Sequence, residues 1–112
     1  MKPTSQSIKK QTTSYHDELI NSLRDPKESA AYLEVALEEY QEDGDTEALL
    51  LALRNVAEAR GGLAKLAKKT NLSRQHLYKL LSKEGNPRLD TFGILLKGLG
   101  FHLSILPVKK IA

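Results

Sequence analysis

The residues with the most suggestive chemistry lie together between Arg74 and Lys79. Arginine and glutamine side chains can each make paired hydrogen bonds to base edges in the major groove of DNA. Apolar Leu77, Leu80 and Leu81 recur at helical spacing, so the polar residues fall on the outer face of a helix. An amphipathic helix whose polar face meets only water is the simpler alternative. The residue types predict base contacts by Arg74, Gln75, His76, Tyr78 and Lys79.

Basic and hydroxyl side chains surround this group. Such side chains bind phosphate oxygens, which fixes the position of a protein on a duplex without reading its sequence. The predicted phosphate contacts are Lys65, Lys69, Ser73, Ser82, Lys83 and Arg88.

The element that must position these residues is a pair of short helices within residues 63–81. Asn71 tolerates the left-handed conformation that ends a helix, Leu72 points inward, and Ser73 can cap the next helix. Together these residues predict a helix-turn-helix.

The remaining chain predicts an all-α fold. Helices are expected over 15–23, 26–41, 46–59 and 89–99, with Asp25 and Asp45 as caps and Gly44 and Gly100 as terminators. The inward face of the helix over 26–41 is predicted to be Ala30, Leu33, Ala36, Leu37 and Tyr40. In the loop over 82–87, Gly85 and Asn86 are the residues most able to take positive φ.

The two ends of the chain differ from this helical middle. Residues 1–14 contain almost nothing apolar and are predicted to be disordered, while 15–108 form a single domain and 109–112 a tail. The segment 101–107 alternates Phe101, Leu103 and Ile105 with polar residues, which predicts a β-strand. A lone strand needs a partner, and pairing with a second copy would give a homodimer. The alternative is an extended tail packed on its own domain.

Charge divides the chain. Acidic residues dominate 25–47 and basic residues dominate from Arg60 onward, although the net charge is only +3. A basic half that contains the predicted helix-turn-helix favours binding of a polyanion.

The chain has no cysteine, no stretch long enough to span a membrane and no signal peptide, so a soluble cytoplasmic protein is expected. The three histidines have no metal-ligand spacing. We therefore expect no enzyme, no metal and no cofactor.

The residues Gly61-Gly62-Leu63-Ala64-Lys65-Leu66-Ala67, Leu72-Ser73-Arg74, Leu77-Tyr78-Lys79 and Glu84-Gly85-Asn86-Pro87 carry a family resemblance. The segment 60–106 resembles the lambda-repressor-like, Xre-type DNA-binding domains, and within them the addiction-module antidote proteins, antitoxins of the HigA type. Residues 30–39 resemble the amino-terminal helix of that family. Asn71 departs from the pattern, because a glycine is usual at that turn.

The resemblance implies a five-helix bundle, a dimer, repression of an operon and neutralisation of a small basic toxin. The expected function is a repressor that binds a palindromic operator on double-stranded DNA and an antitoxin with a cognate toxin partner. A basic toxin would be attracted to the acidic helix, where the toxin-facing residues are predicted to be Glu34, Glu38, Glu39 and Glu42. A regulator without a toxin, or a docking domain that binds no DNA, remains the alternative.

Overall fold

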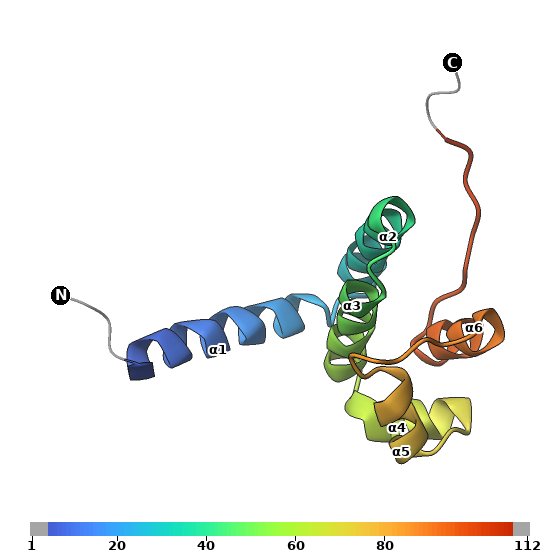
Figure 1. Ribbon diagram of the computed structural model, residues 1–112. Helices are drawn as coiled ribbons and strands as arrows, with labels where there is room; N and C mark the ends of the chain where they lie inside the picture. The colour runs from blue at the N-terminus through green and yellow to red at the C-terminus, as the bar shows by residue number, and fades with distance from the viewer. Residues whose placement is uncertain (1–4, 109–112) are drawn as a thin grey trace.

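A computed structural model describes the backbone of residues 5–108 and the side chains of residues 14–108. Residues 5–108 form six helices and no strand (Figure 1). The helices are α1 (Ser5–Ser22), α2 (Pro26–Asp43), α3 (Thr46–Ala59), α4 (Gly62–Thr70), α5 (Arg74–Leu80) and α6 (Leu89–Gly98). The predicted all-α class is confirmed.

The first two helices of the bundle, α2 and α3, form a hairpin with caps where the sequence predicts them. The Asp25 carboxylate accepts a hydrogen bond from the Lys27 backbone N–H at 2.9 Å, and Pro26 opens α2. Gly44 ends α2 in the left-handed conformation, with φ of 70°. Asp45 then accepts from the Ala48 backbone N–H at 3.1 Å, which begins α3. These caps satisfy backbone donors that a helix start leaves free.

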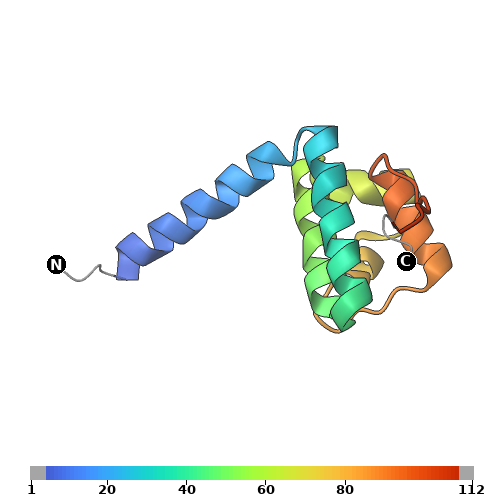
Figure 2. The same ribbon diagram turned by 90° about the horizontal axis from the view of Figure 1, so that it is seen from above.

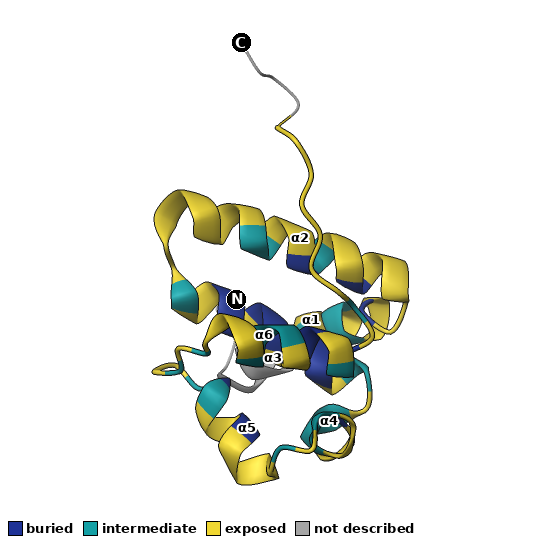
Figure 3. Ribbon diagram, turned by 90° about the vertical axis from the view of Figure 1, so that its right-hand side faces the viewer, coloured by how far each residue is buried: buried dark blue, intermediate teal, exposed yellow. Residues whose placement is uncertain are grey.

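The core is centred on α3, which packs against α1, α2 and α4. Leu50, Leu53 and Val56 are each at most 1% exposed, and leucines from the other helices close over them. Figure 3 shows the buried residues on the inward sides of α2, α3 and α6. Burying a leucine or valine side chain contributes about 1.5–3 kcal/mol, so this stripe holds the bundle together.

Helix α1 begins earlier than predicted. It starts at Ser5 rather than Tyr15, so residues 5–14 are helical here instead of disordered, and residues 1–4 lie outside the described part. The reason is that no glycine or proline interrupts the chain between Ser5 and Ser22. The C-terminal part of α1 docks on the bundle: Leu19 packs against the core, and Leu23, just after the helix, is 1% exposed, whereas Tyr15 is 74% exposed. The rest of the helix projects away from the bundle (Figure 2).

The buried face of α2 is only partly the predicted one: Leu33 is buried and Ala36 and Leu37 are half-buried, whereas Tyr40 is exposed. Ala30 is exposed, and its neighbour Ser29 is fully buried. The Ser29 hydroxyl donates to the Leu23 backbone carbonyl, which ties α2 to the end of α1. A serine can be buried at low cost once its hydroxyl is hydrogen-bonded. A search for apolar residues at helical spacing does not identify a buried serine.

The predicted β-strand over 101–107 does not form in the single chain. The Phe101 N–H donates to the Leu96 carbonyl at 2.8 Å, and residues 102–108 then run along the surface without regular structure. Phe101 packs against the core and Leu103 is 45% exposed, while Ile105 is 97% exposed. Within the described chain no second extended segment lies alongside to complete a ladder, so alternation alone does not make a strand. The predicted tail 109–112 lies outside the described residues.

Candidate nucleic-acid interface

The turn between α4 and α5 is built as its residue types predict. Asn71 follows α4 with φ of 62°, the left-handed conformation that stops the helix. The Thr70 hydroxyl donates to the Leu66 carbonyl at 2.8 Å, and the Leu72 N–H lies 3.3 Å from the same hydroxyl oxygen. The turn therefore ends one helix and holds the start of the next.

Helix α5 is capped by Ser73 and fixed to the core by leucines. The Ser73 hydroxyl oxygen accepts a hydrogen bond from the His76 backbone N–H at 3.0 Å. Leu77 is fully buried and Leu81 is 2% exposed, so α5 presents one defined side to the core. Its other side faces solvent.

Five of the predicted contact residues lie together on the outer face of α5. They line one shallow depression: Arg74, Gln75, Tyr78, Lys79 and Ser82. Tyr78 is 72% exposed, although it is an aromatic residue. His76 is also exposed but does not line the depression, because it is rotated around the helix from the others. Each of these five lining residues has a side chain that can donate a hydrogen bond, and we call this surface, which ends at Ser82 just after α5, the α5 face.

The predicted phosphate-binding cations are exposed on the parts of the chain that precede and follow α5. Lys65 and Lys69 are exposed on α4, and Lys83 is exposed just after α5. Arg88 Nε lies 3.7 Å from the Asp90 carboxylate, and the two side chains are 87% and 69% exposed. An ion pair this exposed contributes little and leaves the guanidinium available. Ser82 is half-buried, and its hydroxyl donates to the Lys79 carbonyl at 2.7 Å.

A glycine that the sequence does not single out fixes α4 against α6. A Cβ atom on Gly98 would lie 2.6 Å from Thr70 Cγ2 and 2.9 Å from Leu66 Cδ1. These distances are shorter than packed carbon atoms allow, so the two helices approach closely only because residue 98 has no side chain. Since α5 follows α4, this contact also sets where the α5 face lies.

The loop after α5 departs from its predicted geometry. Neither Gly85 nor Asn86 has positive φ. A Cβ atom on Gly85 would instead collide with the Leu80 backbone carbonyl, and the Gly85 N–H donates to the Ser82 carbonyl at 2.9 Å. Glycine is therefore required here by the close approach of backbone to backbone.

Arg60 is half-buried and makes contacts within the fold. Its Nε donates to the Leu99 carbonyl at 2.7 Å, and its guanidinium lies 5.4 Å from the centre of the Phe101 ring. It thus joins the end of α3 to the end of α6 by a charge-assisted hydrogen bond and a cation–π contact. Sequence reasoning counted Arg60 only as a positive charge. Its partner is a backbone carbonyl far along the chain, which no local pattern reveals.

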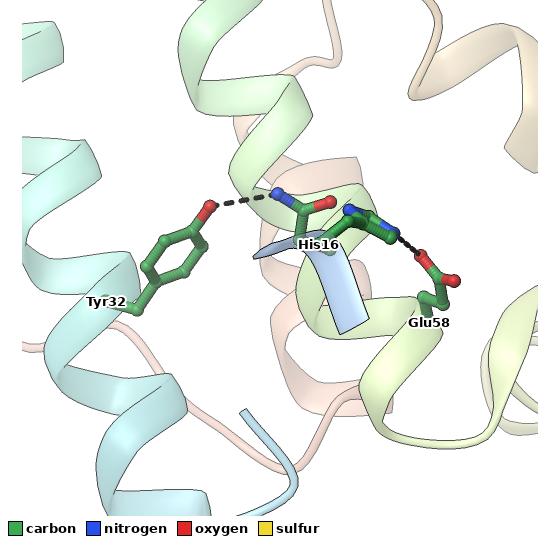
Figure 4. Close-up of polar contacts among 4 residues, drawn as sticks. His16, Tyr32 and Glu58 are labelled. Carbon is green, nitrogen blue, oxygen red and sulfur yellow. Dashed lines mark hydrogen bonds and ion pairs between the residues drawn. The ribbon is translucent and has the colours of Figure 1, made fainter. Parts of the chain in front are cut away.

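Polar contacts also hold α1 and α2 to α3 (Figure 4). His16 Nε2 lies 3.1 Å from the Glu58 carboxylate, where both side chains are about half exposed. The nearby Asn55 is 7% exposed, and its amide donates to the Tyr32 hydroxyl at 3.0 Å. His16 is therefore used as a contact between helices. Among residues 14–108 no group of acidic or histidine side chains could hold a metal ion.

The four glutamates predicted to face a toxin are all exposed on α2: Glu34, Glu38, Glu39 and Glu42. Figures 1 and 3 place α2 at the end of the bundle opposite α4 and α5. The acidic helix and the α5 face are therefore separate surfaces.

The fold and these surfaces define the class of protein: a small helical bundle with a polar helix presented to solvent at one pole and an acidic helix at the other. Within the described residues, none of the helices has the length and apolar character needed to cross a membrane.

The chain belongs to the family described as “Probable addiction module antidote protein”, whose family model matches residues 13–107. It is also similar to an uncharacterized protein of Haemophilus influenzae, with 32% identity over 73 residues. That alignment covers 65% of this chain and 74% of the relative. No solved structure shows significant similarity. Membership of an antidote family indicates an antitoxin of a toxin–antitoxin module, a regulatory role with a toxin as partner.

Proposed function

We propose that this protein is the antitoxin of a toxin–antitoxin module and that it represses its own operon by binding DNA. In this proposal residues 15–108 act as one domain, and α4 and α5 are a helix-turn-helix. A homodimer docks α5 of each subunit into successive major grooves of a palindromic operator. Half-sites one helical turn apart suit such a dimer.

The observation that carries the DNA-binding proposal is the α5 face. Arg74, Gln75 and Lys79 share one side of a helix whose opposite side is fixed by fully buried Leu77. A rigid helix with exposed donors is what base recognition requires, because the side chains must meet base edges at defined positions. His76 and Tyr78 are assigned to bases or backbone nearby. None of these side chains is engaged with another side chain in the hydrogen bonds of the described residues.

Phosphate contacts are assigned to four exposed cations and two hydroxyls: Lys65, Lys69, Lys83, Arg88, Ser82 and Ser73. The four cations are free to neutralise phosphates and release counterions. The two hydroxyls already make intramolecular hydrogen bonds, and each oxygen keeps a further lone pair for a donor. We therefore rank the cations above the serines as determinants of affinity.

The toxin contact is assigned to the exposed glutamates of α2, with Glu38 and Glu39 at the centre. The family description supports a toxin partner. The separation of α2 from α5 means that one molecule could hold a toxin and an operator at the same time. Charge complementarity to a basic partner would raise the association rate more than the affinity.

The test of DNA binding is a titration of the protein against the duplex upstream of its own gene and against a scrambled duplex, at two salt concentrations. We expect a clear preference for the upstream duplex and a steep loss of affinity with salt. Gln75→Ala should reduce this preference by about 5- to 150-fold, because a lost bidentate contact costs about 1–3 kcal/mol of discrimination. Lys69→Ala should weaken both duplexes equally and lower the salt slope by about one.

Lys69→Arg is the matched control, since it retains the charge and should retain binding. Equal losses on both duplexes for Gln75→Ala would remove Gln75 from the base contacts. Equal and salt-insensitive binding of both duplexes by the unaltered protein would overturn the DNA-binding proposal.

For the toxin contact, the double change Glu38→Lys and Glu39→Lys should slow association with the purified toxin at low salt, and an unchanged rate would overturn that assignment.

A further inference from the structure

An open apolar cleft lies between α2 and α6. It consists of two adjoining depressions that share Leu37 of α2 and Leu103 of the C-terminal segment. Leu33 and Leu96 line one depression, and Phe92 and Leu89 line the other. Leu89 is 78% exposed, so apolar surface is left in contact with water along this cleft. Apolar patches of this kind mark interaction sites.

The C-terminal segment that borders the α2–α6 cleft is itself apolar and exposed to solvent. Ile105 is 97% exposed, Leu106 is 73% exposed and Val108 is 74% exposed. Phe101 is anchored to Leu96 by its backbone N–H, whereas the described residues beyond it make no backbone hydrogen bond. An exposed apolar cleft and an exposed apolar segment thus lie side by side in one molecule, each lacking a cover.

We propose that the α2–α6 cleft is the seat of residues 105–108 from a second copy of this chain, so that two subunits exchange their C-terminal segments reciprocally. The inference rests on the homodimer of the proposed function and names the surface that builds it. Reciprocal exchange uses the same patch on both subunits, which is the property of a closed two-fold interface.

A two-fold axis at Ser104 gives this exchange a definite register. Antiparallel pairing about that residue places Leu106 of each chain opposite His102 and Ile105 opposite Leu103. Pro107 has no N–H and Phe101 has already used its own, so the ladder is confined to 102–106. Because Leu103 lines both depressions, the residue opposite it is brought to the mouth of the cleft.

The charges of the cleft and of the C-terminal segment also favour a second copy of this chain as the occupant. Glu34 of α2 lines the cleft, and the exposed glutamates of α2 continue along the same helix. In the sequence, Val108 is followed directly by Lys109 and Lys110. A partner segment that enters the cleft carries these two lysines toward an acidic helix, which is favourable. The segment of the same chain cannot fill the site, because its Leu103, Ser104 and Leu106 already form one wall.

The test uses a disulfide between two differently tagged chains, each with one introduced cysteine, since the natural chain has none. One chain carries Leu37→Cys in the cleft and the other carries Ile105→Cys in the C-terminal segment. After coexpression and mild oxidation we expect a covalent heterodimer of twice the 12.5 kDa chain mass. As the control, Leu51→Cys replaces Leu37→Cys; Leu51 is 48% exposed on α3, lines neither depression and should give no heterodimer.

A second variant tests the same contact without a disulfide. Ile105→Glu should weaken dimerisation at least tenfold in sedimentation measurements, because a charge replaces an apolar residue buried only in the dimer. Ile94→Glu is the matched control: Ile94 is 45% exposed on α6 and lines neither depression, so the dimer should persist. Both variants should retain helical content, since each site is exposed in the single chain.

The outcomes separate this inference from the proposed function. A dimer that binds its operator but forms no disulfide between the two cysteines, and that survives Ile105→Glu, overturns the exchange and leaves the repressor intact. The exchange is also overturned if Ile105→Glu abolishes toxin binding while the dimer persists. In that case the cleft holds the toxin rather than a second copy of the chain. Disulfide formation with no preference for the operator would support the exchange and overturn the DNA-binding proposal.

Discussion

The close approach of α4 and α6 at Gly98 makes a prediction that opposes helix propensity. Replacing glycine by alanine within a helix ordinarily stabilises a protein by up to about 1 kcal/mol. At residue 98, however, the added methyl carbon would lie 2.6 Å from Thr70 Cγ2 and 2.9 Å from Leu66 Cδ1. Neither neighbour can turn aside easily, because Leu66 is 3% exposed and the Thr70 hydroxyl is hydrogen-bonded to the Leu66 carbonyl.

The magnitude follows from these two opposing effects. Overpacking by one methyl group costs about 1–3 kcal/mol, because helices or side chains must shift. Gly98 is the last residue of α6, so only part of the propensity gain applies there. We therefore expect Gly98→Ala to lower the free energy of unfolding by about 1–2 kcal/mol. For a domain of this size, that is a fall in Tm of about 4–12 °C.

Gly93→Ala is the matched control in the same helix. A Cβ atom on Gly93 meets no other atom within 4 Å, and its φ is not positive. This variant should gain up to about 1 kcal/mol from helix propensity. Urea unfolding followed by circular dichroism measures both variants. A Gly98→Ala protein as stable as the unaltered chain would refute the argument that α4 and α6 are held at contact distance by the absence of a side chain.

Substitutions at three further positions test the α4–α5 turn and its support. Asn71→Ala should cost about 1–2 kcal/mol in urea unfolding because alanine is strained at φ of 62°, whereas Asn71→Gly should cost nothing or stabilise. Ser73→Ala should cost about 1 kcal/mol, measured in the same way, by removing the cap on the His76 N–H. Arg60→Met should cost about 1.5–3 kcal/mol through the lost charge-assisted hydrogen bond to the Leu99 carbonyl, and an unchanged midpoint would contradict that role.

Local chemistry explains which parts of the fold could be predicted. Asp25, Gly44 and Asp45 cap or end helices through interactions that span a few residues, so their types alone identify the boundaries. Asn71 and Ser73 work in the same way at the α4–α5 turn. The exposed side of α5 was likewise predictable, because helical spacing separates Leu77 from the polar residues around it.

Contacts between distant residues explain what could not be predicted. Gly98 matters only because Thr70 and Leu66 lie opposite it, and Arg60 only because the Leu99 carbonyl comes within reach. Ser29 is buried because the Leu23 carbonyl turns back toward it. The alternation over 101–107 was misleading because a strand needs a neighbour, and residues 5–108 of the single chain provide none. The assignments of bases, phosphates and toxin stay predictions, as no contact within the chain bears on them.

The two proposals together make different demands on the glutamates of α2. Glu34 lines the α2–α6 cleft, where it would meet the lysines of the partner subunit's C-terminal segment. Glu38 and Glu39 are exposed and line neither depression, so they would be free to meet a toxin in the assembled dimer. Charge reversal at Glu34 should therefore weaken the dimer and with it operator binding, whereas reversal at Glu38 and Glu39 should slow only toxin association. If reversal at Glu34 left the dimer intact, the lysines would not be near α2 and charge would lose its part in selecting the occupant.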